Sequence, residues 1–436
     1  MHFEDILVDL YCLFTGDTNY ISCLPNLGIK NRITMILRKY QFRTDILFLI
    51  KGEPEFTLYR KLWESYKSHK SWGHMAGADK SVNCFLGSIN NSKADEDICK
   101  RGHEQEGSRY LLYNINYGEG FNLRRDVYLR VGNLIRNIND KESWILVLPP
   151  WGDLYHWRNT PRNIFFPWRT FFDIKSLQKW IPVVEFDEFF KDTRHLDSAF
   201  ILQHYEDMWD REWIERYNLS ESVLIDHAEI LMHDNFGSLE YWAARRSMRF
   251  ATHLISEASN YRKTFLDSDD VRDKTKMSED WRDFRPEKGE ALGGPYVCVH
   301  LRRRDFIFAR KDEVPSIEES AKQLRKILED LKLKNLFVAT DAPVNEIKEL
   351  RTHLKDFKVH HFSPTEDFLL KYGDGGTAIV DQIICSRASY ESTFSFRIQE
   401  EREILGFASD TTFNRLCGKN SECQPPTMWK IVDYGV

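Results

Sequence analysis

The chain has 436 residues, a length that accommodates two or three domains with cores of their own. Hydrophobic residues make up 42% and charged residues 29%, which indicates a globular protein rather than a disordered one. The 61 basic and 67 acidic side chains give a net charge of −6, which argues against a general nucleic-acid-binding surface but allows a local basic pocket. No apolar run approaches the roughly 18 to 20 residues of a membrane span, so we expect a chain that does not cross a membrane.

The N-terminal 105 residues differ from the rest of the sequence. Short apolar pieces alternate there with charged ones and end in a linker, "SINNSKADEDICKRGHEQEGS", so we assign 1–105 only as an N-terminal extension of unknown role. The first 20 residues carry acids where a signal peptide needs basic residues, which taken literally predicts a cytosolic chain. The triplets at Asn90 and Asn218 match glycosylation sequons.

The eight cysteines contain no CxxC pair with zinc spacing, so we expect no metal site. Cys417 and Cys423 can close a small disulfide loop if the compartment is oxidising.

A strand, a loop and a helix are expected in that order after the extension. "RYLLYNI" (109–115) is typical of a buried strand, and apolar residues at helical spacing predict a helix over 121–138. Glu119 lies at this corner between Gly118 and Gly120, where paired glycines allow positive φ and the free amides of a helix start favour an anion. Either Glu119 is a solvent-facing residue of a tight turn, or its carboxylate is placed for chemistry.

The α/β pattern continues through the first half. We expect a strand over 144–152, which makes a βαβ unit, and then a helix and a strand within 167–190. Residues 221–266 read as mostly helical, and the charged run 266–294 reads as a linker with a short helix that ends at a Gly-Gly-Pro break.

A second α/β half follows. Its expected elements are strands over 295–301 and 335–341 and helices over 316–334, 377–389 and 392–406, the last closed by Gly406. Two consecutive βα halves predict two Rossmann-like domains, 106–285 and 286–436, with a ligand between them at the carboxyl ends of the strands.

Basic side chains cluster where the strand 295–301 ends. In "YVCVHLRRRDF", the period of two puts His300, Arg302 and Arg304 on one face, at the strand end where α/β sheets bind ligands. Arginine suits phosphate because its planar fork donates two parallel hydrogen bonds and stays charged. Either this is a phosphate site, or it is a solvated cluster paired with Asp305.

Hydroxyl and carboxyl side chains follow in the expected helices. Ser392, Thr393 and Ser395 open the last helix, where they either cap it or, with the free amides, hold a phosphate. Asp381 lies in mid-helix and either accepts hydrogen bonds from a nucleobase edge or pairs with a basic neighbour. Asp341, which ends "NLFVATD", is a weaker candidate of the same kind.

Common nucleotide and hydrolase motifs are missing from the sequence. It contains no Walker lysine loop, no GxGxxG fingerprint and no GxSxG elbow. NTPase, dehydrogenase and serine hydrolase functions therefore have no support.

Several long blocks resemble one known family in its own order. "YLLYNINYGEGFNLRRDVYLR", "WILVLPPWGDLYHW", "LGGPYVCVHLRRRDF", "FVATDA", "GGTAIVDQIIC" and "STFSFRIQEEREILG" resemble the GDP-fucose protein O-fucosyltransferases, specifically those that fucosylate thrombospondin type 1 repeats. The resemblance runs from about residue 108 to the C-terminus. It implies a GT-B-like glycosyltransferase of the endoplasmic reticulum lumen that inverts the anomeric centre, uses GDP-fucose without an obligatory metal or cofactor, and acts on folded repeats.

The resemblance also assigns the site residues. In this resemblance the family's catalytic base falls on Glu119. Such a base is needed because the acceptor hydroxyl has a pKa far above 7. Arg302 would hold the diphosphate, whose charge builds in the transition state, and Asp381 would hold the guanine side. The residues assigned to GDP-fucose binding are Gly118, Gly120, Phe121, Asn122, His300, Leu301, Arg302, Asp381, Ser392, Thr393 and Phe394.

The chain departs from the family pattern in three places. Residues 1–105 match nothing in the family and lack its signal peptide, and the chain is shorter near 214–218 by a cysteine-containing segment. "CSRASYESTFSFR" lacks the short strand and Gly-Thr turn that precede the hydroxyls of family members. This last departure favours an alternative, a catalytically impaired pseudoenzyme or a splice or gene-model variant that binds cysteine-rich repeats. A transferase that uses another GDP-sugar is a second alternative.

Overall fold

The computed structural model describes most of the chain after the N-terminal extension, and the described residues belong to one compact unit, 65–436. They are 108–116, 118–140, 142–192, 196, 198–201, 220–231, 237–309, 314–392, 396–412 and 416–418. Asn90 and Asn218, which head the two sequons, and Cys423 lie outside them.

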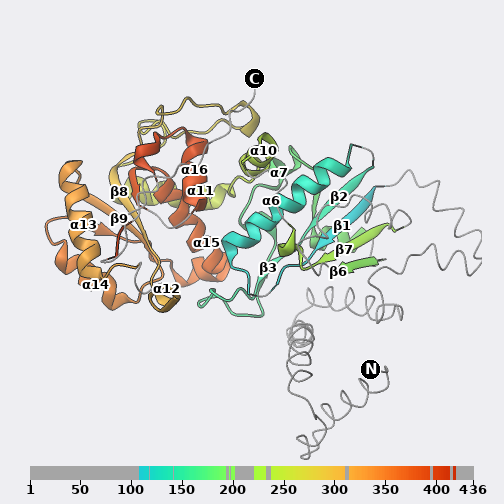
Figure 1. Cartoon of the computed structure of the whole chain (residues 1–436), viewed down its shortest axis with the longest axis horizontal. Coiled ribbons are helices and arrows are strands. Elements are labelled where there is room, and N and C mark those ends of the chain that lie inside the picture. Colours follow the sequence, from blue (N-terminus) through green and yellow to red (C-terminus); the bar gives the residue numbers. More distant parts are fainter. Residues whose placement is uncertain are drawn as a thin grey trace, which may run out of the picture. The chain divides into compact units, whose positions relative to one another are not determined.

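The first sheet has five parallel strands in the order β5-β2-β1-β7-β6 (Figure 1). A parallel sheet is covered on both faces, which explains its nearly continuous apolar strands. Leu111 in β1 lies opposite Leu146 in β2 and Val223 in β7, and all three are buried. The strands are β1 (Arg109–Tyr113), β2 (Trp144–Leu148), β5 (Val183–Glu185), β6 (Ser198–Ile201) and β7 (Ser222–Asp226).

Helices and a small hairpin surround this sheet. The helix predicted over 121–138 is confirmed with the same bounds as α6 (Phe121–Ile138). The other elements are α7 (Ile174–Gln178), α8 (Phe186–Asp192), α10 (Leu239–Ser247), the antiparallel pair β3 (Trp151–Gly152) and β4 (Phe165–Phe166), and the short 3-10 helices η3 (Trp168–Thr170), η5 (Ala228–Ile230) and η6 (Trp281–Asp283).

The second sheet has four parallel strands in the order β10-β9-β8-β11. Its strands are β8 (Gly294–Leu301), β9 (Asn335–Thr340), β10 (Lys358–His360) and β11 (Ala388–Ser392). Its helices are α11 (Thr252–Phe265), α12 (Arg304–Ala309), α13 (Ile317–Asp330), α14 (Val344–His353), α15 (Glu366–Ser386) and α16 (Phe396–Leu405), followed by η7 (Ser409–Thr411).

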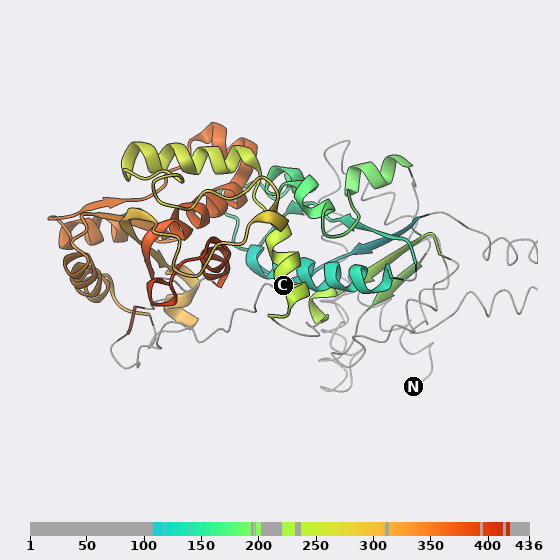
Figure 2. The same cartoon turned by 90° about the horizontal axis from the view of Figure 1, so that it is seen from above.

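Successive residues of β8 enter two different hydrophobic cores. Tyr296 and Cys298 pack in the core that includes α15, whereas Val297 and Val299 pack in the core that includes α13 and α14. Figure 1 shows α13 and α14 on one face of this sheet and α15 and α16 on the other, and Figure 2 shows α11 beside α15. Two parallel sheets covered by helices confirm the predicted α/β class, while the domain boundary at residue 285 stays a prediction.

Two predictions of local structure were wrong in the first half. Residues 222–226 of the expected helical stretch form β7, because a run of Ser, Val, Leu and Ile fits beside β1 in the buried sheet. The expected strand over 144–152 is two strands, since Pro149 and Pro150 cannot donate to a ladder and separate β2 from β3.

The strand thought to be missing near residue 390 is present. The helix expected over 377–389 ends at Ser386, and β11 follows and pairs with β8, with Ser392 opposite Val299. The sequence prediction failed because Ala388–Ser392 is short and partly polar, and β8 supplies the pairing that stabilises it. By contrast, Gly406 closes α16 with a φ of 84°, as predicted.

A disulfide joins β8 to α15. Cys298 and Cys385 are both buried, their Cα atoms are 5.1 Å apart, and 87 positions separate them in the sequence. This bond links the strand that leads to Arg302 with the helix that carries Asp381. Cys417 is also disulfide-bonded, as predicted.

We expect the Cys298→Ala variant to lower the free energy of unfolding by about 2–4 kcal/mol, because the cross-link restricts a long loop of the unfolded chain. The measurement is chemical denaturation of the non-reduced protein. The Cys298→Ala/Cys385→Ala double variant is the control and should lose little more, since the first substitution already removes the bond. A single variant as stable as the wild type would contradict this role.

Candidate functional site

Two of the predicted site loops follow inner strands of the two sheets, and a third segment follows an edge strand, β11. In the first sheet β1 lies between β2 and β7, and in the second β8 lies between β9 and β11. At such a point the connections of neighbouring strands leave in opposite directions, which opens a crevice beyond their carboxyl ends. The loop with Glu119 follows β1, Arg302 follows β8, and the segment from Ser392 to Phe394 begins at the end of β11.

The backbone of the loop between β1 and α6 is held by hydrogen bonds to backbone and side-chain groups. The amide of Glu119 donates to the carbonyl of Asn116 at 3.0 Å, and the amide of Asn116 donates to the Glu229 carboxylate at 3.0 Å. From the helix, Arg124 Nε donates to the carbonyl of Glu119 at 3.1 Å. The peptide at Glu119 is therefore fixed from both sides.

The Glu119 carboxylate itself is available for chemistry. It is half-buried, and it makes no hydrogen bond or ion pair with any residue that the structure describes. Burial raises its pKa above the ordinary value, and the negative charge of Glu229 raises it further, against the opposing effects of Arg124 and Arg130. A carboxylate with a raised pKa and no partner is a better proton acceptor than a solvated or paired one.

The glycines beside Glu119 do not serve the purpose expected from the sequence. Neither Gly118 nor Gly120 has a positive φ; Gly120 is extended, with a φ of −76°, at the N-cap of α6. A Cβ atom on Gly120 would lie 3.3 Å from Cδ2 of His156, whereas one on Gly118 would meet nothing within 4 Å. Gly120 is thus explained by the close approach of a histidine ring.

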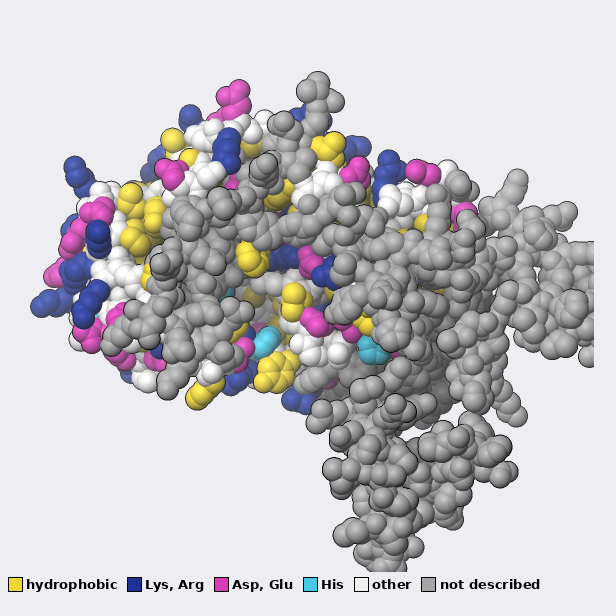
Figure 3. All heavy atoms as spheres, in the orientation of Figure 1, with side chains coloured by type: hydrophobic (Ala, Val, Ile, Leu, Met, Phe, Trp, Pro, Cys, Tyr) yellow, Lys and Arg dark blue, Asp and Glu magenta, His cyan; other side chains and the backbone are white. Residues whose placement is uncertain are grey.

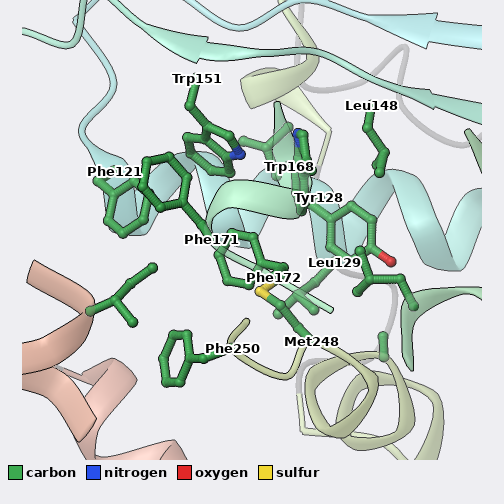
Figure 4. Packing of buried hydrophobic residues seen from close by; sticks show 14 of the residues in the cluster. Phe121, Tyr128, Leu129, Leu148, Trp151, Trp168, Phe171, Phe172, Met248 and Phe250 are labelled. Atoms are coloured by element: carbon green, nitrogen blue, oxygen red, sulfur yellow. The ribbon is translucent and has the colours of Figure 1, made fainter. Parts of the chain in front are cut away.

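Phe121 anchors the start of α6 in an aromatic cluster. Its ring packs edge-on against Trp151 at 4.9 Å and against Phe171 at 5.7 Å (Figure 4). Asn122, the next residue, contacts the second half of the chain, because its Oδ1 accepts from Gln382 Nε2 at 3.3 Å. The Asn122 contact places the start of α6 against α15, the helix that carries Asp381.

Arg302 lies just beyond the end of β8. The strand stops at Leu301 and α12 begins at Arg304, so the predicted common face of His300, Arg302 and Arg304 does not extend past the strand. The Arg302 guanidinium pairs with Asp305 at 2.9 Å and Asp341 at 3.2 Å. It remains half-buried, with a side-chain exposure of 22%, so a ligand can still reach it.

His300 and Leu301 form the end of the strand beneath Arg302. Burial lowers the pKa of His300 to about 4, so the imidazole is neutral at pH 7, and its buried Nδ1 has no hydrogen-bond partner in the described structure. Leu301 packs its side chain in the core, and its carbonyl accepts from the Thr340 hydroxyl at 2.7 Å. Leu301 therefore positions the strand end, and His300 offers an unused ring nitrogen.

Asp381 is confirmed in the middle of a helix, α15. Its Oδ1 is buried and accepts no hydrogen bond from the described residues, and burial raises its pKa well above the ordinary value. A buried carboxylate without a donor is costly to ionise, and a ligand that supplies donors would remove that cost.

The hydroxyl segment is only partly described. Ser392 ends β11, whereas Thr393, Phe394 and Ser395 lie outside the described residues, and α16 begins at Phe396. The predicted phosphate contacts of Ser392, Thr393 and Phe394 therefore stay predictions.

His156 and Gln382 also contact the predicted site residues, although the sequence did not single them out. Nδ1 of His156 lies 3.3 Å from Nη2 of Arg302, and Gln382 accepts from Arg125 Nη1 at 2.6 Å while it donates to Asn122. Both side chains join the first half of the chain to the second. The only available signal was that each belongs to a block of the family resemblance, "GDLYHW" and "IVDQII".

The arrangement combines an unpaired base with an arginine and a buried carboxylate across two halves. No group of three or more His, Cys, Asp or Glu side chains in the described part of the chain is placed to bind a metal, and metal independence stays a prediction. None of the described helices is both long and apolar enough to cross a bilayer. On the face in Figure 3, the described basic and acidic side chains are intermixed.

Comparison with known proteins identifies the family. The sequence model of the GDP-fucose protein O-fucosyltransferases matches residues 110–405. The chain belongs to this family. It is therefore a fucosyltransferase, and the family span contains each described site residue from Glu119 to Asp381.

Curated relatives extend the match beyond this span. The chain is 40% identical over 389 residues to GDP-fucose protein O-fucosyltransferase 2 of Caenorhabditis elegans. This match covers 74% of this chain and 90% of that protein. It is 40% identical over 386 residues to the Homo sapiens protein of the same name, and that match also covers 74% of this chain and 90% of the relative. The match to the Drosophila melanogaster protein of the same name is 32% identical over 441 residues and covers 79% of this chain and 90% of the relative.

Solved structures are more distant. The crystal structure of POFUT1 in complex with GDP has a TM-score of 0.48 and 15% identity and covers 70% of this chain and 98% of that one. A crystal structure of POFUT1 in complex with GDP-fucose has a TM-score of 0.47 and 15% identity. That match covers 69% of this chain and 97% of the POFUT1 chain.

We expect Asp381→Asn to weaken GDP binding by about tenfold or more, because a hydrogen bond to a charged group contributes about 1.5–3 kcal/mol, and about 1.4 kcal/mol corresponds to tenfold. In the protein without GDP, by contrast, the substitution should increase stability at neutral pH. The raised pKa of Asp381 means that the wild type loses stability as the pH rises through that pKa. The thermal midpoint of the variant, relative to the wild type, should therefore increase from pH 4 to pH 8.

The matched control is Asp367→Asn on the same helix, whose exposed carboxylate pairs with Lys371 at 2.8 Å. It should change neither GDP binding by calorimetry nor the pH dependence. Equal effects of the two substitutions would contradict a nucleotide role for Asp381.

Proposed function

We propose that the chain transfers fucose from GDP-β-L-fucose to Ser or Thr hydroxyls of folded thrombospondin type 1 repeats, with inversion at the anomeric carbon. The observation that carries the mechanism is the Glu119 carboxylate, half-buried and without a partner among the described residues, at the carboxyl end of a central strand. The choice of acceptor rests on the resemblance to transferases that modify these repeats.

In the proposed reaction Glu119 removes the proton of the acceptor hydroxyl as its oxygen attacks the anomeric carbon. The attack comes from the face opposite to GDP, the bond from the anomeric carbon to the β-phosphate oxygen breaks, and an α-linked fucose results. A raised pKa suits Glu119 to this task, because proton transfer is most effective when the base titrates near the working pH.

Departure of GDP requires stabilisation of the charge that develops on its β-phosphate. Arg302 offers a guanidinium just beyond the end of β8, where it is paired with Asp305 and Asp341. The neutral His300 ring and the start of α16, which follows Ser392, Thr393 and Phe394, lie on the same sheet edge as Arg302. Asp381 would accept from the guanine edge.

The pseudoenzyme alternative rested on a missing strand and a missing Gly-Thr turn before the hydroxyl segment. The strand β11 occupies the position of the first, which removes half of this argument, whereas the sequence still lacks the Gly-Thr turn. A transferase that uses another GDP-sugar differs in the sugar pocket, and assays of transfer from GDP-fucose and GDP-mannose separate the two.

We also propose that the protein works in the lumen of the endoplasmic reticulum. Disulfides persist in oxidising compartments, and the bonds at Cys298, Cys385 and Cys417 support that setting. Mass spectrometry of the native protein should find all three cysteines oxidised. Free thiols at these positions would contradict the proposal.

We expect Glu119→Gln to abolish most transfer while GDP-fucose binding stays within a few-fold of the wild type. Glutamine keeps the size of the side chain and cannot accept the proton, which typically costs a factor of about 10² to 10⁴ in rate. Radiolabelled transfer to a folded repeat measures the first quantity, and calorimetry measures the second. A variant that keeps most of the activity would contradict the role of Glu119.

Glu229→Gln is the matched control, since it removes a neighbouring carboxylate and leaves the base. Because Glu229 raises the pKa of Glu119, its removal should lower that pKa. The acid limb of the kcat/KM profile should then move to lower pH while the maximal rate is largely retained. An acid limb at unchanged pH would show that another group sets it.

A further inference from the structure

His156 lies between the two halves of the site. It follows β3 in a loop whose neighbouring residues Leu154 and Trp157 are buried, and the amide of Trp157 donates to the carbonyl of Leu154 at 2.9 Å. The Trp157 indole also packs against Phe121 at 5.9 Å. The loop is thus anchored in the aromatic core, while His156 itself remains exposed.

The His156 ring touches both loops that carry the proposed chemistry. Its Nδ1 is 3.3 Å from Nη2 of Arg302, and its Cδ2 and Nε2 would be 3.3 and 3.7 Å from a Cβ on Gly120. Gly120 directly follows Glu119. The His156 imidazole therefore lies between the loop that carries Glu119 and the guanidinium of Arg302.

The contact with Arg302 determines the protonation of the ring. A guanidinium has donors and no acceptor, so Nδ1 of His156 must accept, and the ring proton must lie on Nε2. Although much of the residue is exposed, partial desolvation of the ring lowers the pKa of His156, and the positive charge of Arg302 lowers it further, against Asp305 and Asp341. The neutral ring that the hydrogen bond needs is thus favoured.

The other partners of Arg302 do not orient it toward Glu119. Asp305 belongs to α12, and Asp341 follows β9, so both ion pairs lie within the second half. Among the described residues, His156 supplies the hydrogen bond that Arg302 makes to the first half. Without it, the guanidinium is free to settle on its two carboxylates.

We propose that His156 is a positioning residue of fucosyl transfer, whose Nδ1 holds the Arg302 guanidinium beside the loop that carries Glu119. This inference rests on the proposed roles of Glu119 and Arg302. The benefit is geometric, because attack and departure must be aligned across two halves of the chain, and small misplacements of reacting groups are costly.

The test is a double-mutant cycle with His156→Ala, Arg302→Ala and the double variant, read as kcat/KM for transfer and as the dissociation constant of GDP. His156→Ala should lower kcat/KM about 10- to 100-fold, the range of about 1.5–3 kcal/mol for a hydrogen bond to a charged group. When Arg302 is already alanine, the same substitution should change either quantity less than about twofold, as expected for residues that act as one unit.

Two further variants separate positioning from packing. In His156→Asn the side-chain oxygen can replace Nδ1, whereas in His156→Gln the amide lies nearer to the position of Nε2. Asn should therefore restore transfer to within a few-fold of the wild type, and Gln should resemble Ala. If His156 acted only by packing its ring against Tyr155, at 4.8 Å, both Asn and Gln would lose that packing and would lower transfer equally.

His353→Asn is the matched control, an exposed histidine of α14 that lies 3.9 Å from Glu349 and should leave transfer and GDP binding unchanged. The inference would be overturned if His156→Ala lowered kcat/KM by the same factor whether position 302 is Arg or Ala. Rescue of transfer by Gln but not by Asn would overturn it as well. An inactive Glu119→Gln together with an independent His156 would overturn only this inference. An active Glu119→Gln would overturn the proposed function instead.

Discussion

The site depends on a buried ion pair between Asp126 of α6 and Arg397 of α16. Arg397 Nη2 lies 2.8 Å from Asp126 Oδ1, and its Nη1 lies 2.8 Å from Glu400, which also accepts from Arg245 at 2.8 Å and from the Tyr241 hydroxyl at 2.5 Å. Each of these charges is costly to bury alone, so they must stay together. Pairing accordingly raises the pKa of Arg397 and lowers that of Glu400, in both cases against the effect of burial. Three helices from distant parts of the sequence, α6, α10 and α16, are thereby joined.

This network fixes the starts of α6 and α16 relative to each other. The helix α6 begins directly after Glu119 and Gly120, and α16 begins after the hydroxyl segment, so an ion pair between the helices fixes both starts. Two further bridges act in the same direction: Arg125 donates to Gln382 at 2.6 Å, and Asp374 accepts from the amide of Thr160 at 2.9 Å. Removal of one partner of a buried pair costs about 3–5 kcal/mol, so the two halves are held in one arrangement.

Within that arrangement the surroundings give similar side chains different roles. Glu119 and Asp381 have raised pKa values and lack partners in the described structure, whereas Asp305 and Asp341 are paired with Arg302. The first two carboxylates therefore remain available to a proton and to hydrogen-bond donors of a ligand. The second two are paired with the Arg302 guanidinium, which is half-buried and remains accessible. The chemistry is thus distributed by burial and pairing more than by residue type.

The sequence by itself determined the α/β class, the exact span of α6 and the placement of Glu119, Arg302 and Asp381, because apolar periodicity and strand ends are local properties of the chain. It did not determine β11, since a short polar strand forms only where β8 offers a ladder, nor the bond between Cys298 and Cys385. The roles of Gly120 and His156 were equally hidden, because their contact joins loops from different elements. Only the tertiary structure decided which carboxylates are paired and which remain free, since pairing depends on side chains brought together from distant positions.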